Sequence, residues 1–116
     1  MSDFYYEECG RQGDIVRVVL SGKIDSFHCD YLFQCVERQI ADGCKKLILD
    51  CKDLEYISSL GMAMLVRAHA RMKKHGGDVK ITGLRGVAAA AVRLVNLDRI
   101  FEIYPTLEET VAAHGG

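Results

Sequence analysis

The sequence predicts an α/β fold in which one mostly parallel sheet of about five strands packs against about four helices. Two patterns alternate along the chain: short runs rich in β-branched residues, and longer segments whose apolar residues recur every three or four positions. The 116 residues are 49% hydrophobic and 27% charged, an ordinary balance for a globular protein. This length is typical of one domain, so we expect a single domain over residues 1–116.

The first two strands are predicted to form a hairpin at the edge of the sheet. Residues 4–8 are aromatic in character, and residues 15–20 are rich in β-branched side chains. The turn between them lies at residues 10–14, with Gly13 and Asp14 at its tip. Because hairpin strands are antiparallel and the later strands alternate with helices, the first strand is expected as the antiparallel edge of a parallel sheet.

A loop over residues 21–26 is expected to lead into a helix over residues 27–41. Asp25 or Ser26 can cap this helix, because each side chain accepts a hydrogen bond from a free backbone N–H. Gly43 lies where a helix-terminating glycine is expected. The predicted buried face keeps a spacing of three and four residues, with one polar member. It consists of Tyr31, Leu32, Cys35, Val36, Gln39 and Ile40.

A central strand and a second helix follow. Residues 46–51 carry three consecutive large aliphatic side chains, which is typical of a strand covered on both faces. Residues 52–57 are expected to connect this strand to a helix that begins after Ser58 and Ser59 and ends near Lys74. The predicted buried face of this helix consists of Gly61, Met64, Leu65, Ala68 and Met72.

The last part of the chain predicts two more strands and two more helices. The strands are expected at residues 78–82 and 100–104, and the helices at residues 87–95 and 107–113. Thr106 precedes the last helix and is a favoured capping residue.

Composition excludes several classes of function. The formal net charge is -1 and no basic stripe is present, so no nucleic-acid partner is expected. No apolar run approaches the roughly 18 residues of a membrane span, so no direct membrane insertion is expected. The first residues lack the features of a signal peptide. The five cysteines are odd in number and lack C-x-x-C spacing, which indicates reduced thiols and a cytoplasmic location.

The sequence contains no recognisable catalytic or cofactor motif. It has no glycine-rich phosphate loop, no zinc-ligand spacing and no nucleophile elbow. We therefore expect no catalytic residues, no metal and no cofactor, and a protein that is not an enzyme. The four histidines are scattered without an acid or base companion, and solvated surface positions are predicted for them. They are His28, His69, His75 and His114.

The most informative segment delivers two serines to the start of the second helix. Sites in open α/β sheets lie at the carboxyl ends of strands, and Ser58 and Ser59 follow such a strand. A phosphate on a serine there would be stabilised by the helix dipole and free N–H groups. Alternatively, either serine caps the helix. Gly61 is expected to leave the surface bare for a partner backbone, and Asp50 is expected to anchor the turn after its strand.

At this point the chain resembles the STAS domain family, which includes the anti-sigma factor antagonists. The resemblance covers about residues 16–113 and rests on the order and spacing of four segments. These are residues 20–25 (LSGKID), 47–50 (LILD), 56–62 (YISSLGM) and 77–81 (GDVKI). It implies an STAS-like fold: a single layer of mostly parallel sheet packed with helices.

The resemblance also implies a partner and a switch. Family members of the antagonist type bind an anti-sigma factor that is a serine kinase, lose this binding when phosphorylated, and regain it through a phosphatase. The phosphoacceptor position falls on Ser59, while Ser58 stands where a common family pattern has aspartate and is a second candidate acceptor. Asp25 matches an acidic residue of the partner-binding loop, and Gly22 matches the tight turn before it.

We therefore expect an anti-sigma factor antagonist-like protein that phosphorylation of Ser59 switches off. A phosphoserine carries about -1.5 to -2 charges, and a docked interface near Asp25 would disfavour it. Met62 and Val66 can add an exposed apolar patch. The expected partner surface consists of Gly22, Asp25, Ser26, Ile57, Ser58, Ser59, Leu60, Gly61, Met62 and Val66. The alternatives are an accessory subunit of a membrane transport complex and a small-ligand or nucleotide-binding module; a homodimer is also possible.

Overall fold

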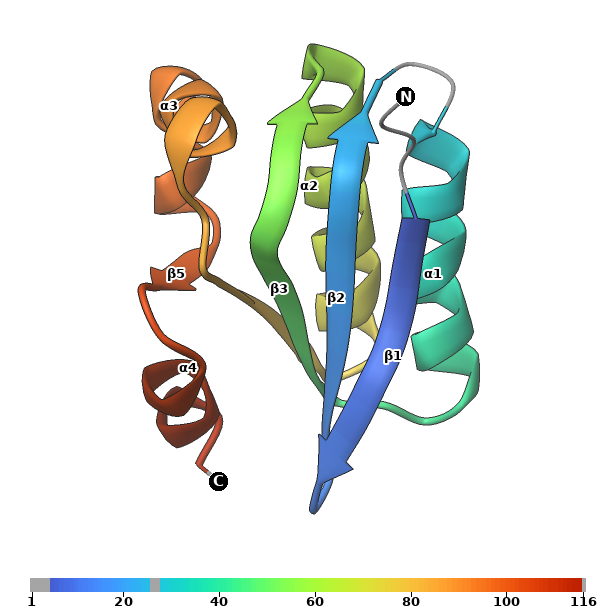
Figure 1. Cartoon of the computed structure of the whole chain (residues 1–116). Helices are drawn as coiled ribbons and strands as arrows, with labels where there is room; N and C mark the ends of the chain where they lie inside the picture. Colours follow the sequence, from blue (N-terminus) through green and yellow to red (C-terminus); the bar gives the residue numbers. More distant parts are fainter. Residues whose placement is uncertain (1–4, 26–27, 116) are drawn as a thin grey trace.

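Five strands form one sheet in the order β1–β2–β3–β4–β5 (Figure 1). The computed structural model describes the backbone of residues 5–25 and 28–115, and the side chains of residues 13–25 and 28–115. The strands are β1 (Tyr5–Gln12), β2 (Ile15–Ile24), β3 (Lys46–Ile57), β4 (Asp78–Thr82) and β5 (Glu102–Tyr104). β1 pairs antiparallel with β2, and the other pairings are parallel. The predicted fold class, with its antiparallel edge strand, is confirmed.

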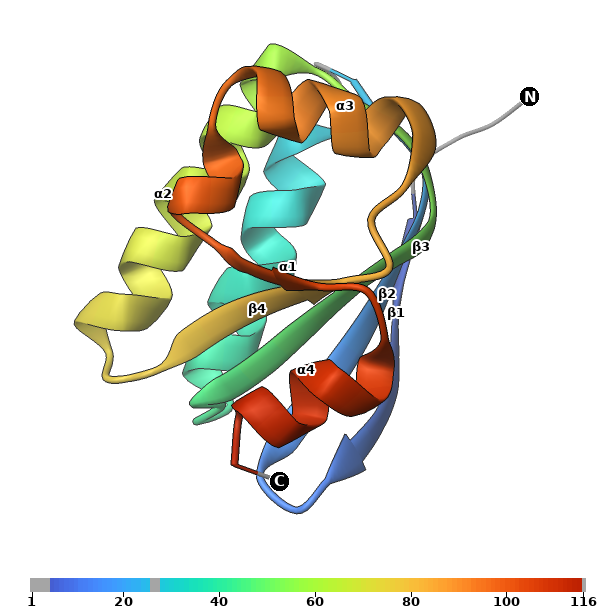
Figure 2. The same cartoon turned by 90° about the vertical axis from the view of Figure 1, so that its left-hand side faces the viewer.

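Within the described residues, four helices and one 3₁₀ turn connect or follow the strands. They are α1 (Cys29–Ala41), α2 (Ser59–Lys74), α3 (Gly86–Leu94), η1 (Leu97–Arg99) and α4 (Leu107–Ala113). α1 and α2 lie side by side against one face of the sheet, and α4 lies on the other side of β4 from α2 (Figures 1 and 2). Apolar side chains of β2, β3 and β4 form the main core against α1 and α2. This arrangement brings the ends of β2 and β3 to the start of α2.

β2 and β3 are longer than the sequence indicated. Residues 21–24 and 52–57, both expected as connections, extend these strands and pair with one another up to Ile24 and Ile57. β4 pairs with β3 only as far as Asp50, so the second half of β3 has a strand on one side only. Because exposed positions at this edge accept polar residues, residues 52–57 have the polar composition that is typical of a loop, and the sequence therefore predicted a connection there.

The ends of α1 follow two different rules. At its end, Gly43 has a φ of +85°, and the N–H groups of Gly43 and Cys44 donate to Ile40 and Gln39. This is the glycine-dependent helix end that the sequence predicted. At its start, His28 precedes the first turn without a side-chain cap, and the Asp25 side chain contacts His28 instead. The expected cap by Asp25 is therefore wrong, and Ser26 lies outside the described residues.

Three predicted surface or core positions are corrected by the structure. Tyr31, expected on the buried face of α1, is 57% exposed. His69, expected at the surface, is buried with Nε2 3.1 Å from Asp78 Oδ1 and its ring stacked on Phe101. His114, also expected at the surface, is buried, and its Nε2 lies 3.0 Å from the Leu47 carbonyl oxygen. The partners of both histidines are distant in sequence, so periodicity could not reveal them.

Replacement of Leu49 by alanine tests the core. Leu49 is fully buried in the first half of β3, so Leu49→Ala removes apolar contacts and leaves a cavity. We expect a loss of about 3 kcal/mol in the free energy of unfolding, measured by urea denaturation. Leu94→Ala is the matched control, because Leu94 is 84% exposed, and it should change stability by less than about 0.5 kcal/mol. Equal effects would contradict the assigned core.

The burial of His114 predicts a pH-dependent stability. Burial lowers the pKa of His114 below its ordinary value, so the unfolded chain binds the proton more readily. The stability that the neutral ring contributes is therefore present above about pH 6.5 and is lost as pH falls through the folded pKa. His114→Gln keeps an N–H donor without titrating. Urea unfolding at pH 7.5 and 5.5 should show a smaller loss for this variant than for the parent; equal losses would contradict the account.

Candidate functional site

A backbone contact joins the end of β2 to the start of α2. Ile24 and Ile57 are paired at the ends of β2 and β3, and the Ser58 N–H donates to the Ile24 carbonyl oxygen at 2.7 Å. The chain leaves β3 at this point and enters α2 directly. Asp25, which follows Ile24, therefore lies near the two serines, as the resemblance implied.

Ser58 is the N-cap of α2. Its Oγ accepts a hydrogen bond from the Gly61 N–H at 3.0 Å, and its side chain is half-buried. Cys29, at the start of α1, is buried beside it: burial raises the pKa of the Cys29 thiol, and a hydrogen bond with Ser58 opposes that rise. The hydroxyl of Ser58 is thus committed to holding the first turn of α2.

Ser59 is the first residue of α2 and is exposed. It does not cap the helix, because Ser58 does, and among the described residues no hydrogen bond engages its hydroxyl. The N-terminus of a 16-residue helix carries a partial positive charge and free N–H groups. The position can therefore accept a negatively charged group without rearrangement of the cap.

Gly61 lies against the sheet and not on the surface. A Cβ at this position would come within 2.9 Å of Ile24 Cγ2 and of Ile57 Cγ1. The expectation that Gly61 leaves the surface bare for a partner is therefore wrong: its missing side chain lets α2 approach the strand ends closely. Ile57 is likewise buried, so both residues pack in the interior below the exposed start of α2.

Gly22 and Asp25, which precede α1 in the sequence, are positioned by glycine geometry and by local bonds. Gly22 has a φ of +87° and lies at a register shift between β2 and β3, a conformation that favours glycine. Asp25 Oδ1 lies 2.8 Å from His28 Nδ1, and the Asp25 carbonyl oxygen accepts bonds from the His28 N–H and the Cys29 thiol. The Asp25 carboxylate is about half exposed.

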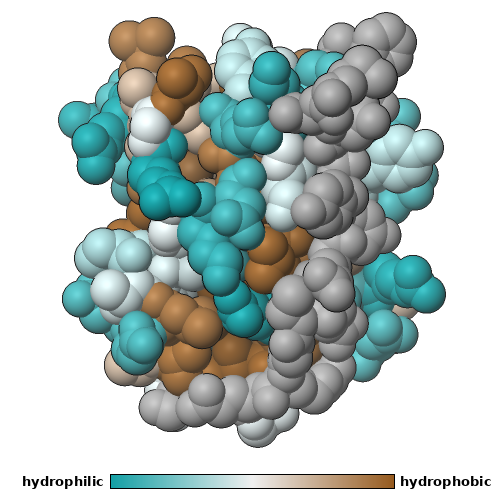
Figure 3. Space-filling model, in the orientation of Figure 1, coloured by the Kyte–Doolittle hydropathy of each residue, from teal (hydrophilic) through white to brown (hydrophobic). Residues whose placement is uncertain are grey.

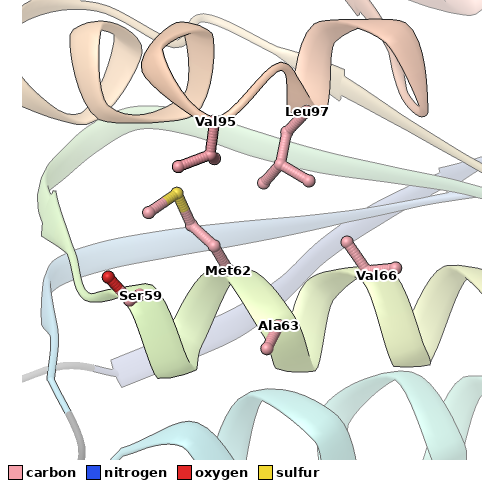
Figure 4. Close-up of a pocket in the computed structure, with 6 residues that line it drawn as sticks. All are labelled: Ser59, Met62, Ala63, Val66, Val95 and Leu97. Atoms are coloured by element: carbon pink, nitrogen blue, oxygen red, sulfur yellow. The ribbon is translucent and has the colours of Figure 1, made fainter.

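Met62 and Val66 do not form the exposed patch that the sequence suggested. Met62 is only 7% exposed and Val66 is half-buried, because both turn toward the chain that follows α3. They line a hollow of about 210 Å³ (Figure 4). Its lining residues are Ser59, Met62, Ala63, Val66, Val95 and Leu97. Leu60, beside Ser59, is exposed.

Sequence reasoning missed the second wall of this hollow. Val95 and Leu97 lie more than twenty residues beyond the end of α2 in the sequence, and Asn96 between them has a φ of +60° that turns the chain. One signal for this wall was present in the sequence. The alanines and Val92 of α3 already form the buried face of that helix, so the apolar residue Val95 after it had no evident place in the core.

Asp50 does not anchor a turn as the sequence predicted, because β3 continues past it to Ile57; it has an unpredicted partner instead. Its Oδ1 accepts the Lys52 N–H at 3.1 Å, and its Oδ2 accepts two bonds from Arg17 at 2.7 and 3.0 Å. Because the carboxylate is buried, the paired guanidinium compensates its charge. Asp50 is therefore a structural group away from the serines.

The part of the chain that the structure describes lacks a metal cluster and a membrane-spanning helix. The described side chains, those of residues 13–25 and 28–115, include no group of three or more histidine, cysteine or acidic side chains placed to hold a metal ion. Over the same residues, none of the helices combines the length and apolar character required to cross a bilayer.

The different roles of the two serines predict different effects on stability. Ser58→Ala removes the cap of α2 and should lower the free energy of unfolding by about 1 kcal/mol. Ser59→Ala removes an exposed hydroxyl and should change it by less than about 0.5 kcal/mol. Urea denaturation of both variants measures the difference. A larger loss for Ser59→Ala would mean that the cap is assigned to the wrong serine.

Comparisons with known proteins agree with this architecture. The anti-sigma-F factor antagonist RsfB of Mycobacterium tuberculosis is 25% identical over 99 residues, which cover 84% of this chain and 79% of that protein. The crystal structure of an anti-sigma factor antagonist from Mycobacterium paratuberculosis superposes with a TM-score of 0.81 at 24% identity, over 97% of this chain and 93% of that one.

A more distant structure has the same fold. The Bacillus cell fate determinant SpoIIAA, in its phosphorylated form, has a TM-score of 0.66 at 16% identity, over 96% of this chain and 98% of that one. The sequence profile of the STAS domain matches residues 8–110. With most of the chain covered by that profile, the resemblance seen in the sequence is confirmed: the protein belongs to the STAS domain family.

Proposed function

We propose that this protein is an anti-sigma factor antagonist that binds a serine-kinase anti-sigma factor in the cytoplasm and is released when Ser59 is phosphorylated. A phosphatase would restore binding. The names of its relatives support this function: RsfB is an anti-sigma-F factor antagonist, and SpoIIAA has been solved in a phosphorylated form. The chain needs no catalytic group for this role, because the kinase supplies the nucleotide and the chemistry and the chain supplies a hydroxyl.

The exposure of Ser59 is the observation that carries the proposal. A kinase must reach the hydroxyl that it modifies. Ser59 is exposed, and its hydroxyl does not cap α2, because Ser58 is the N-cap. The Ser58 hydroxyl is half-buried and bonded to the Gly61 N–H, so phosphorylation there would first break the helix cap. Of the two serines, Ser59 is therefore the better acceptor.

The surroundings of Ser59 explain how a phosphate would release a partner. Exposed Leu60 and the hollow lined by Met62 are apolar surfaces, which a docked partner would cover and dehydrate. Asp25 adds a negative charge on the neighbouring segment. A phosphate of about -1.5 to -2 charges in that interface would lose hydration and meet like charge. A loss of about 3 kcal/mol already lowers affinity more than a hundredfold.

Two substitutions of Ser59 test the switch. Ser59→Ala should bind the serine-kinase anti-sigma factor of the same organism with unchanged affinity and should not incorporate phosphate from ATP. Ser59→Asp should bind at least tenfold more weakly, because it places a charge in the interface. Calorimetric titration measures affinity, and peptide mass spectrometry measures phosphate.

Ser58→Ala is the matched control and should still be phosphorylated on the adjacent serine. Phosphate that persists in Ser59→Ala, or binding by Ser59→Asp as tight as the parent, would contradict the proposal.

A further inference from the structure

The hollow beside Ser59 has the size and chemistry of a receptor for apolar side chains. All of its lining residues except Ser59 are apolar, and its volume is about 210 Å³. Small-molecule sites usually enclose about 300–1,000 Å³ and contain several converging polar groups. This hollow offers one hydroxyl, so it is suited to one or two side chains of a protein partner and poorly suited to a small ligand.

The exposed face of α3 continues the apolar surface beyond the hollow. Val87, Ala90 and Leu94 recur at intervals of three and four residues and therefore share one face of the helix. Val87 is 64% exposed, Leu94 is 84% exposed, and Val95, which lines the hollow, is 49% exposed. Apolar side chains gather over α3 at the upper left of Figure 3. Such a contiguous apolar surface on a folded protein indicates an interaction site.

The wall of the hollow that follows α3 lies in a basic stretch of the chain, although the whole chain has a formal net charge of -1. α2 contains no acidic residue, and the stretch of residues 85–100 contains only Asp98. The basic residues of that stretch are Arg85, Arg93 and Arg99. The basic residues of α2 do not add to this wall, because Arg67 lies over the Phe33 ring of α1 and Arg71 pairs with Glu37 of α1. The remaining excess of positive charge favours an acidic partner and disfavours a second copy of the same basic surface.

The shape of the walls indicates how the partner enters. One wall is α2 and the other is the turn from α3 into η1, where the backbone groups largely bond within the helices and turns. A partner strand would need an open strand edge to pair with, and the hollow has none. A helix instead presents side chains at intervals of three and four residues, which matches a groove lined by Ala63, Val66 and Val95.

We propose that the hollow between α2 and the Val95–Leu97 turn receives an acidic amphipathic helix of the bound kinase, with apolar anchors in the hollow and acidic residues facing the arginines. This inference rests on the proposed function and names the part of the partner that docks. Since Ser59 lines the same hollow, a phosphate there would face both the apolar anchors and the acidic residues of the helix. One modification would thus remove apolar packing and charge complementarity together.

Binding of the purified serine-kinase anti-sigma factor to variants of the full chain tests this inference. Ala63→Asp and Val95→Asp place a carboxylate in the hollow, and each should weaken binding about thirtyfold or more. Arg93→Glu should weaken binding about tenfold at low salt and less at high salt. Tyr31→Asp is the matched control, because it places a carboxylate at an exposed position of α1, and this variant should bind like the parent. Thermal unfolding verifies that each variant is folded.

A photocrosslinking residue at position 63 then identifies the occupant. Crosslinks to an acidic amphipathic helix of the kinase, together with the affinity losses, support the inference. If the parent binds the kinase but the hollow variants bind equally well, or if crosslinks join two copies of this chain or a basic segment, the inference is wrong and the proposed function stands. If the parent does not bind the kinase at all, both fail.

Discussion

The close packing of Gly61 on Ile24 and Ile57 is the constraint on which the site depends. Any side chain at position 61 would collide with both isoleucines at 2.9 Å, so only glycine lets the first turn of α2 lie directly on the strand ends. The Ser58 N–H bonds the Ile24 carbonyl oxygen in the same place and fixes where the helix begins. These two contacts turn Ser58 inward as a cap and leave Ser59 at the surface.

From this junction follow two surfaces of different character. On the β2 side, Asp25 Oδ1 lies 2.8 Å from His28 Nδ1, which precedes α1. On the α3 side, an apolar hollow begins at Ser59 itself, and the stretch that forms its second wall carries Arg93 and Arg99. A charge added to Ser59 would therefore act on both surfaces at once. This position explains how one small modification of an exposed hydroxyl could alter an entire docking interface.

Sequence reasoning identified most of the fold because local patterns encode most of it. The β-branched run of β2, Gly43 after α1 and Thr106 before α4 each act within a few residues, and the structure agrees with all three. Positions decided by distant contacts were missed or misjudged. His69 and His114 are buried by partners far along the chain, and Val95 reaches the hollow only through the left-handed turn at Asn96. At the candidate site, the sequence pointed to both serines. It could not show that Gly61 faces the sheet, because this orientation depends on a contact with Ile24, which belongs to another element.

Phosphopeptide mapping of the protein from its native host tests the central claim most directly, namely that the chain places one serine for modification and the other for capping. The protein would be isolated under conditions in which the partner kinase is active, and the peptide that contains both serines would be fragmented. The account predicts phosphate on Ser59 and none on Ser58. Phosphate on Ser58, or a peptide that stays unmodified while the kinase is active, would contradict it.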